Sequence, residues 1–283
     1  MTKTIDTLVD DIYELVDKGK DIRGKNLISM LDDISNSVRE QFDPTTRNKT
    51  KTLRMSNIGK PECQIWHELH GTKGEELRPE TRIKFLFGHI IEALTIFLVK
   101  EAGHTVTDEQ KEVSIEGIKG HMDCKIDGVV VDVKSAATRA FQKFEKNTVA
   151  DDDPFGYIAQ LSSYAFAENQ ETAAFLAMGK EQGKLALAPM DSMDFIDPCE
   201  RIKYLKEAMA LDTPPERCYT DVEDGKSGNM KLNLNCSYCA FKEECWKDVN
   251  DGAGLRTFLY SNGPRYLTKV ERLPDVFEKS KGD

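Results

Sequence analysis

The chain has no apolar run long enough to cross a membrane, and its first residues lack the basic start and apolar core of a secretory signal. It also has no internal repeat and no low-complexity tract. These absences exclude a helical membrane protein and a repeat array. They predict a cytoplasmic location, where disulfides are rare, so the seven cysteines need another explanation.

Positive charge is in deficit, because 39 Lys and Arg stand against 49 Asp and Glu, for a formal net charge of -10. This excludes an electrostatic attraction to nucleic acid over the whole surface. A local basic groove is still allowed, since the field in a cleft depends on nearby charges. The 283 residues, 39% hydrophobic and 31% charged, suit one large globular domain or a core with appendages.

Residues 1–47 contain two helical patterns, DTLVDDIYELVDK and NLISMLDDISNSVREQF, which predict a helical N-terminal appendage. The polar stretch DPTTRNKTKTLR follows, and we interpret it as a solvated linker. A DNA-contacting loop is the alternative, because its basic residues are Arg47, Lys49, Lys51 and Arg54. The core is expected over 48–250 and a C-terminal tail over 251–283.

A longer helix is predicted by PETRIKFLFGHIIEALTIFLVKEAG, from Pro79 to about Ala102, with Gly103 as its C-cap. His89 and Glu92 are three residues apart, so they share a face of this helix. A glutamate in such apolar surroundings needs a partner. Both side chains are therefore candidates for a functional site.

The dipeptide Asp127-Gly128 lies between two runs that alternate apolar and polar residues, the strongest short-range signal for a β-hairpin. A two-residue turn pairs Ile126 with Val129 and Cys124 with Val131. Because side chains alternate along a strand, one face of the hairpin is apolar. That face consists of Met122, Cys124, Ile126, Val129, Val131 and Val133.

The same register makes Asp123 and Asp132 cross-strand neighbours, on the face that also carries Lys134. Like charges in that position destabilise a hairpin. One interpretation is a solvated polar face with a local ion pair. The other is a divalent cation that bridges the carboxylates, since hard cations prefer carboxylate oxygens; Mg²⁺ or Mn²⁺ fits, and a histidine ligand favours Mn²⁺.

Other segments predict an α/β fold with a mixed central sheet flanked by helices. Strands are expected at 104–107, 111–117, 120–126 and 129–135, a helix at 154–169, a second hairpin in TAAFLAMGKEQGKLALAP and a helix in DPCERIKYLKEAMALD. The segment TRAFQKFEKN interleaves basic and aromatic residues. It suits a nucleic-acid contact and an amphipathic helix about equally.

Three cysteines, Cys236, Cys239 and Cys245, form a C-x2-C-x5-C pattern that can converge on one metal. Cys63, in IGKPECQIW, is the natural fourth ligand. Zinc and a [4Fe-4S] cluster both accept four thiolates, although structural zinc sites usually show two short ligand pairs. Of the remaining cysteines, we interpret Cys124 and Cys199 as structural, and the role of Cys218 is ambiguous.

Several of these features together resemble the PD-(D/E)XK nuclease superfamily: Glu92, Asp123, Asp132-Val133-Lys134 and Gln160-x3-Tyr164. Over about residues 60–250 the chain is similar to RecB/AddB-type exonucleases and CRISPR-adaptation nucleases, and GHIIE at 88–92 is similar to phage lambda-type exonucleases. Iron–sulfur members share one upstream cysteine and a downstream C-x2-C-x5-C set. The resemblance therefore implies a restriction-endonuclease-like core whose N- and C-terminal parts are joined by a [4Fe-4S] cluster on Cys63, Cys236, Cys239 and Cys245.

The resemblance also implies a metal-dependent DNA exonuclease that acts on linear ends, with a recombination or helicase partner. The implied metal ligands are Asp123, Asp132, the backbone carbonyl of Val133, and Glu92 or His89. Lys134 would orient or activate the attacking water, while Gln160 and Tyr164 would position DNA or Lys134.

Two other functions stay open. One is a non-catalytic iron–sulfur module that binds DNA ends for a partner nuclease or helicase. The acid pair argues against it, because a pure binding module has no need of repelling carboxylates. The other is a zinc-stabilised interaction protein. The chain's size suggests a phage gene, whose product would act in the host cytoplasm.

Overall fold

The structure is a computed structural model that describes residues 3–45 and 51–280. The chain forms two compact units. Unit 1 contains the described residues up to 59 together with 77–205, and unit 2 contains 60–76 and 206–280. The three-part division that the sequence predicts, with boundaries at residues 47 and 250, stays a prediction. Arg47 and Lys49 lie outside the described residues, so the two interpretations of the polar stretch also stay open.

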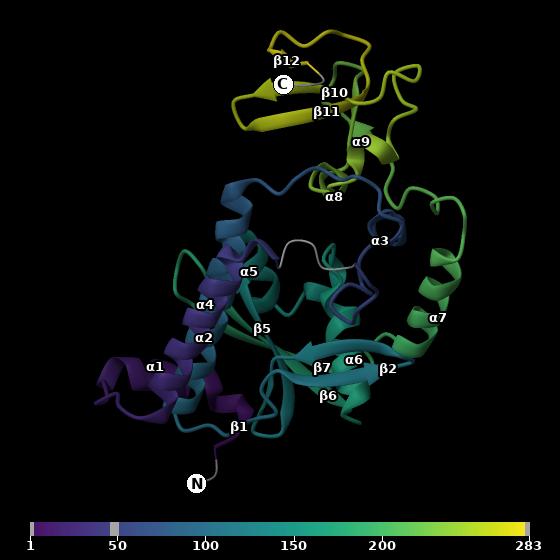
Figure 1. The fold of residues 1–283 in the computed structure, drawn as a ribbon. Helices are drawn as coiled ribbons and strands as arrows, with labels where there is room; N and C mark the ends of the chain where they lie inside the picture. Colours follow the sequence, from purple (N-terminus) through teal and green to yellow (C-terminus); the bar gives the residue numbers. More distant parts are fainter. Residues whose placement is uncertain (1–2, 46–50, 281–283) are drawn as a thin grey trace. The chain divides into compact units, whose positions relative to one another are not determined.

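Unit 1 is built on a five-stranded sheet in the order β1-β4-β5-β6-β7. Figure 1 labels four of its strands, β1, β5, β6 and β7. β5 and β6 run parallel, whereas the other neighbours are antiparallel, so the predicted mixed sheet is confirmed. Its strands are β1 (Val106–Thr107), β4 (Cys124–Ile126), β5 (Val129–Ala136), β6 (Thr172–Gly179) and β7 (Leu185–Asp191). A separate hairpin pairs β2 (Lys111–Ile115) with β3 (Ile118–Met122).

Helices cover both faces of this sheet. Leu8 of α1 and Val99 of α4 share a buried cluster with Val131 of β5 and Leu176 of β6. Phe175 points to the opposite face, since side chains alternate along β6, and there it meets α5 and α6 through aromatic contacts. The helices are α1 (Leu8–Lys18), α2 (Lys25–Phe42), α4 (Pro79–Glu101), α5 (Thr138–Glu145), α6 (Tyr157–Ala167) and α7 (Pro198–Met209). None of the described helices has the length and hydrophobicity needed to span a membrane.

The predicted β-hairpin is confirmed. Asp127 and Gly128 have φ of 50° and 88°, as a two-residue turn with positive φ requires. Cys124 pairs with Val131, and the neighbouring pairs follow the expected register. The turn is also tied to α1 by the buried ring of His104, which lies 2.7 Å from Asp127 Oδ2 and contacts Asp11 of that helix.

The prediction of one continuous strand over 120–126 was wrong. The chain changes partners at Asp123: β3 pairs with β2, and β4 pairs with β1 and β5. The β2–β3 turn, Glu116-Gly117, has φ of 51° and 79°. Glutamate is not a residue that typically signals such a turn, which is why the sequence pattern did not indicate that residues 120–126 are divided between two hairpins.

Unit 2 contains a five-stranded antiparallel sheet in the order β12-β10-β11-β9-β8. Its core includes Leu232, Trp246 and Leu255, with Cys236 and Cys245 packed against them. The elements are α3 (Glu62–Leu69), β8 (Val222–Glu223), β9 (Met230–Lys231), α8 (Leu234–Ser237), α9 (Lys242–Cys245), β10 (Arg256–Tyr260), β11 (Gly263–Lys269) and β12 (Glu278–Lys279).

Two glycines fix the start of α6, the helix that carries Gln160 and Tyr164. Gly156, its N-cap, has φ of 75°, a conformation that side-chain-bearing residues rarely adopt. Its backbone lies so close to Gly59 that a Cβ on either residue would overlap the backbone of the other. The position of α6 in unit 1 therefore depends on the absence of both side chains.

We expect Gly156→Ala to lower the free energy of unfolding by about 2 kcal/mol or more, because it adds a steric overlap to the strain of positive φ. Gly117→Ala is the matched control, since Gly117 has φ of 79° but nothing within 4 Å of its Cβ position. The control should lose about 1 kcal/mol, from strain alone. Urea denaturation followed by circular dichroism measures both, and equal losses would rule out the steric explanation.

Candidate active site

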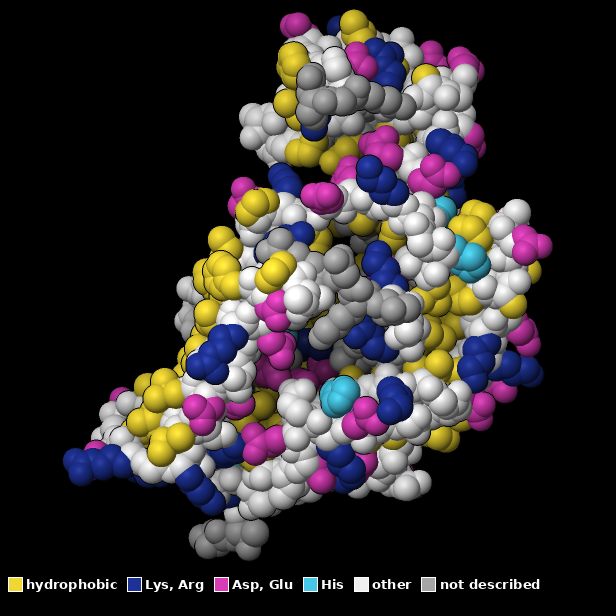
Figure 2. All heavy atoms as spheres, viewed as in Figure 1, with side chains coloured by type: hydrophobic (Ala, Val, Ile, Leu, Met, Phe, Trp, Pro, Cys, Tyr) yellow, Lys and Arg dark blue, Asp and Glu magenta, His cyan; other side chains and the backbone are white. Residues whose placement is uncertain are grey.

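Three carboxylates and one ammonium group meet beside β5. Asp132 and Lys134 lie on β5, Asp123 lies at the break between β3 and β4, and Glu92 comes from α4. The pKa of each carboxyl group depends on other members of this set, so they act as one electrostatic cluster. Figure 2 shows a recess in this face of unit 1 where acidic side chains lie beside lysine and arginine side chains.

Asp123 is held by a backbone contact. Its Oδ2 atom accepts a hydrogen bond of 2.7 Å from the N–H of Val133. This contact is possible because the β4–β5 ladder ends at the pair of Cys124 and Val131, which leaves the next part of β5 without a β4 neighbour. The strand break that the sequence did not predict therefore places the Asp123 carboxylate against β5.

Asp132 is the most unusual group of the cluster. Only 1% of its surface is exposed, and its Oδ1 atom has no hydrogen-bond partner among the described residues. Its one charged contact is an ion pair of 2.5 Å between Oδ2 and Lys134 Nζ. A buried charge with so few partners is costly, so this site is either protonated or completed by a cation.

Burial raises the pKa values of all three carboxyl groups, and repulsion from neighbouring acids adds to the shift for Glu92 and Asp123. Burial raises the pKa of Glu92 to about 7, with the Asp132 charge as the next cause. The pKa of Asp123 is raised well above its usual range, by burial and then by Asp132 and Glu92. Burial also raises the pKa of Asp132, although Lys134 opposes the shift. One ammonium group is thus too little positive charge for three ionised carboxylates.

Lys134 remains an ammonium group in these surroundings. Burial disfavours its charge, but Asp132 and Asp123 outweigh that effect and raise its pKa. Its Nζ atom donates to Gln160 Oε1 at 3.4 Å, and Gln160 in turn donates to the Tyr164 hydroxyl at 3.2 Å. The same Nζ lies 4.6 Å from the centre of the Tyr157 ring. One face of α6 therefore holds the lysine in place.

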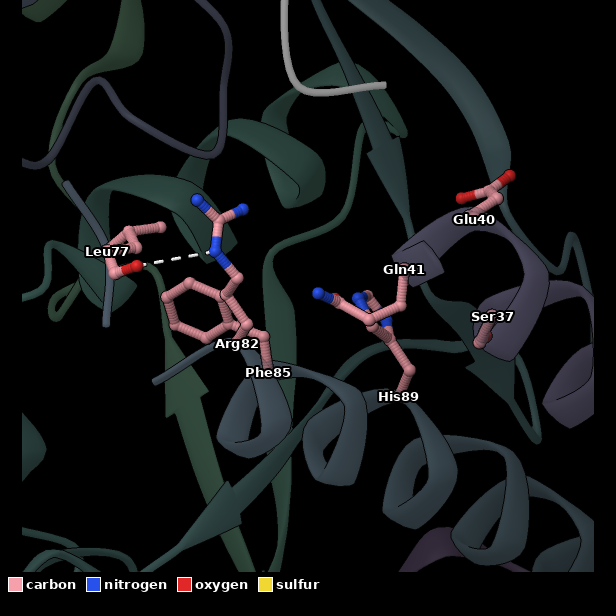
Figure 3. A pocket seen from close by; sticks show the side chains of 7 residues that line it. All are labelled: Ser37, Glu40, Gln41, Leu77, Arg82, Phe85 and His89. Atoms are coloured by element: carbon pink, nitrogen blue, oxygen red, sulfur yellow. Dashed lines mark hydrogen bonds between the residues drawn. The ribbon is translucent and has the colours of Figure 1, made fainter. Parts of the chain in front are cut away.

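His89 lies in a different setting from Glu92, although the two share a helix face. It is exposed and lines a pocket of about 420 Å³ between α2 and α4. Figure 3 shows Arg82, Phe85 and His89 projecting from α4 into this pocket, with Gln41 of α2 beside His89. The sequence could not decide whether His89 or Glu92 is the metal ligand. In the structure His89 lines the pocket, whereas Glu92 belongs to the acid cluster.

Across the described residues, 3–45 and 51–280, no group of three or more His, Cys, Asp or Glu side chains is positioned to hold a metal ion as it stands. The donor set of the acid cluster nevertheless suits a hard cation, because it offers three carboxylates, and Asp132 Oδ1 is buried without a hydrogen-bond partner among the described residues. The other oxygen of Asp132 is paired with Lys134. Metal binding would require the side chains to turn toward one another.

The segment TRAFQKFEKN forms α5, with the aromatic rings of Phe141 and Phe144 buried. Lys143 donates to the carboxylate of Asp152 at 2.6 Å. The rings are therefore not available to stack on nucleic acid bases, and the interpretation as an amphipathic helix is confirmed. Arg139 and Lys146 lie on its exposed side.

The four cysteines that the sequence groups together all belong to unit 2. Cys63 lies on α3, Cys236 on α8 and Cys245 on α9, and Cys63 and Cys245 are hydrogen-bonded to each other. All seven cysteines are free thiols. Cys124 is buried on the apolar hairpin face, as predicted, and Cys199 lies in α7.

Two residues that lie near the acid cluster, Tyr157 and Gln110, were not identified from the sequence. Tyr157 precedes Gln160 and Tyr164 by three and seven residues, so helical periodicity places it on their face and could have identified it. Gln110 donates to Glu92 at 2.9 Å from a turn residue with φ of 50°. No sequence signal links that turn to α4.

The raised pKa of Glu92 predicts a pH-dependent stability. Between its usual value of 4.5 and about 7, the folded state binds more protons here than the unfolded state. Stability from this group is therefore lost as pH rises through that range. We expect Glu92→Gln, measured in chelator, to melt several degrees above wild type at pH 8 and close to wild type at pH 4.5.

Glu101→Gln is the matched control on the same helix. Hydrogen bonds from Lys20 and then Asn26 lower the pKa of Glu101, so its contribution is present at high pH and lost as pH falls. This variant should melt below wild type at pH 8. A melting temperature of Glu92→Gln below wild type at pH 8 would contradict the electrostatic strain inferred for the cluster.

No protein-family model matches the chain, and no curated protein matches its sequence. Among solved structures, the protein SSO0001 is 14% identical, with 78% of this chain and 96% of that one covered and a TM-score of 0.42. The alkaline exonuclease LHK-Exo of Laribacter hongkongensis is 12% identical in two structures. Its complex with dAMP has a TM-score of 0.36, covering 56% of this chain and 89% of that one. The other has a TM-score of 0.29, covering 54% and 91%. TM-scores this low carry no functional argument. Function is argued from the acid cluster instead.

Proposed function

We propose that the protein is a divalent-metal-dependent nuclease that hydrolyses phosphodiester bonds of DNA, acting as an exonuclease on linear ends. The observation that carries the proposal is the buried Asp132 carboxylate beside Asp123 and Glu92: one of its oxygens has no hydrogen-bond partner among the described residues, and the other is paired with Lys134. Mg²⁺ and Mn²⁺ are the cations that such oxygens suit. Action at DNA ends follows from the resemblance to RecB/AddB-type and lambda-type exonucleases.

A bound cation would neutralise phosphate charge and so favour attack by water at phosphorus. Asp123 and Asp132 would hold it, with Glu92 and the carbonyl of Val133 completing the oxygen set. Lys134 supplies positive charge to this set through its ion pair with Asp132. With a cation held by the carboxylates, the lysine would donate to the attacking water or to a phosphate oxygen.

Lys134 would act as a fixed hydrogen-bond donor. Gln160 and Tyr164 form a chain of hydrogen bonds behind its Nζ atom, and the Tyr157 ring lies beneath it. These contacts restrict the ammonium group to one direction, which is what orientation of a nucleophile requires. Gln160 and Tyr164 are therefore proposed to position the lysine.

The pocket between α2 and α4 is the proposed path of the DNA strand. His89 and Glu92 lie within one helical turn of each other, so the pocket adjoins the acid cluster. Arg82 can contact a phosphate, and Phe85, with half of its surface exposed, can stack on a base. The Glu40 carboxylate on the α2 wall would repel phosphate and favour its placement along α4.

Unit 2 is proposed to hold a metal centre on Cys63, Cys236, Cys239 and Cys245. The resemblance favours a [4Fe-4S] cluster with a structural role. The donor chemistry fits, since thiolates suit both iron–sulfur clusters and zinc. The α3 thiol is far in sequence from the thiols of α8 and α9, so a shared metal would join two distant parts of the chain.

We expect end-labelled linear DNA to be degraded in Mn²⁺ or Mg²⁺ but not in chelator, while a closed circle survives. Asp132→Asn should abolish this cleavage, and Lys134→Ala should slow it by about 10²–10⁴-fold, because each removes one element of the proposed chemistry. Release of labelled nucleotides over time provides the measurement, with single- and double-stranded substrates in parallel.

Glu112→Gln is the control, because Glu112 is an exposed acid on β2 that pairs with Lys119 outside the cluster. It should retain wild-type cleavage. If circles are also cut, the protein is an endonuclease and the proposed action at ends is wrong. If wild type cuts nothing in any metal but binds labelled ends, a non-catalytic end-binding module replaces the nuclease.

A second prediction separates the two ligand candidates on α4. Mn²⁺ should raise the melting temperature of wild type and of His89→Ala, since a ligand that binds only the folded state stabilises it. The shift should be absent in Glu92→Gln and Asp132→Asn. His89→Ala should instead weaken binding of a labelled oligonucleotide, measured by fluorescence anisotropy in Ca²⁺. Loss of the Mn²⁺ shift in His89→Ala would make His89 the metal ligand.

A further inference from the structure

A fifth thiol lies at the cysteine cluster of unit 2. The Sγ atom of Cys218 is 3.2 Å from the Sγ atom of Cys63. Cys63 in turn is hydrogen-bonded to Cys245. Cys218 stands outside the C-x2-C-x5-C pattern, and the sequence left its role ambiguous. The structure thus places a fifth thiol beside one of the four that the resemblance requires, although no three such side chains in the described part of the chain are positioned to hold a metal ion as they stand.

Cys218 is held in this place by its neighbour Arg217. The Nε atom of Arg217 donates to the carbonyl oxygen of Cys245 at 3.0 Å, and its guanidinium group pairs with Asp248. The same group lies 4.1 Å from the centre of the Trp246 ring. Three contacts with one segment fix the backbone next to Cys218, so the short Sγ–Sγ distance does not depend on a loose loop.

Cys63 is anchored separately, through α3 and the residues after it. The His67 ring stacks on Phe241 at 5.6 Å between ring centres, and Glu75 pairs with the buried Lys242. Trp66 Nε1 donates to the carbonyl of Leu211 at 2.9 Å. Both backbones are therefore fixed on the segment that contains Phe241 and Asp248, and each brings one thiol to the same point.

The distance between these two sulfurs limits how they can bind. Two thiolates on one zinc ion are about 3.8 Å apart, as Zn–S bonds of about 2.3 Å in tetrahedral geometry require. In a [4Fe-4S] cluster each thiolate binds a different iron, so the ligand sulfurs lie farther apart still. At 3.2 Å, Cys63 and Cys218 occupy what is in effect one ligand position. Cys245, which is also hydrogen-bonded to Cys63, would have to turn away from it to bind another iron.

We propose that Cys63 and Cys218 are alternative ligands for the same iron of the centre, while Cys236, Cys239 and Cys245 hold the other three. The proposal rests on the metal centre proposed above for unit 2. The thiol that binds loses its proton, and the other keeps its proton and donates a hydrogen bond to the bound sulfur. Either cysteine alone can complete the site.

The test uses the full chain, purified without oxygen, as wild type, Cys63→Ser, Cys218→Ser and the double variant. Iron, zinc and acid-labile sulfide per chain are measured together with visible absorbance. Cys199→Ser is the matched control, because Cys199 is a partly buried thiol of α7 outside the cluster. We expect the control and both single variants to keep the wild-type iron and sulfide, and the double variant to lose them.

Three outcomes overturn the proposal. Loss of iron in Cys63→Ser alone means that Cys63 is the ligand and Cys218 does not bind. Loss of iron in Cys218→Ser alone means that Cys218 is the ligand and Cys63 does not bind. Loss in both single variants means that the two thiols bind at the same time, as in a zinc site. Absence of metal from wild type removes the centre itself. DNA cleavage by the same wild-type preparation shows separately whether the nuclease proposal holds, since the acid cluster lies in unit 1.

Discussion

Repulsion between buried carboxylates is the constraint on which the rest of unit 1 depends. Asp132 has almost no access to water, and the charges of Asp132 and Glu92 both raise the pKa of Asp123. A fold that only needed stability would place apolar side chains here, since unpaired buried charge costs free energy. The cluster persists because the backbone holds it: the Val133 N–H binds Asp123, and strands on both sides enclose β5. Strain of this kind is typical of sites that bind an ion or carry out chemistry.

The central position of β5 explains why one strand can carry both core and site. Val131 and Val133 pack toward α1 and α4, whereas Asp132 and Lys134 point toward α6. A strand buried on both faces offers a rigid support and a low dielectric at once. The first property fixes the direction of Lys134, and the second strengthens every electrostatic interaction of the cluster.

Much of this arrangement follows from sequence, and the failures have physical causes. The Asp127-Gly128 turn and the alternation of apolar and polar residues predicted the register of the β4–β5 hairpin. This was possible because both are local properties of the sequence. Burial of Asp132 could not be predicted, since it depends on how α6, within the crossover between β5 and β6, packs against the sheet. The strand break at Asp123 was missed because the β2–β3 turn uses a glutamate. Cys218 has no spacing that links it to Cys63, and only the contacts of Arg217 bring it near.

The cysteine centre of unit 2 differs from the acid cluster in what a metal would do there. Cys63 and Cys218 are 155 residues apart, so unit 2 is assembled from two distant stretches of chain. Closing a loop of that length in an unfolded chain costs on the order of 4–5 kcal/mol of entropy. A metal shared by α3 and the cysteine-rich segment would keep that loop closed after unfolding. It would thus reduce the conformational freedom of the denatured chain, whereas a cation at the acid cluster would act only on the native state.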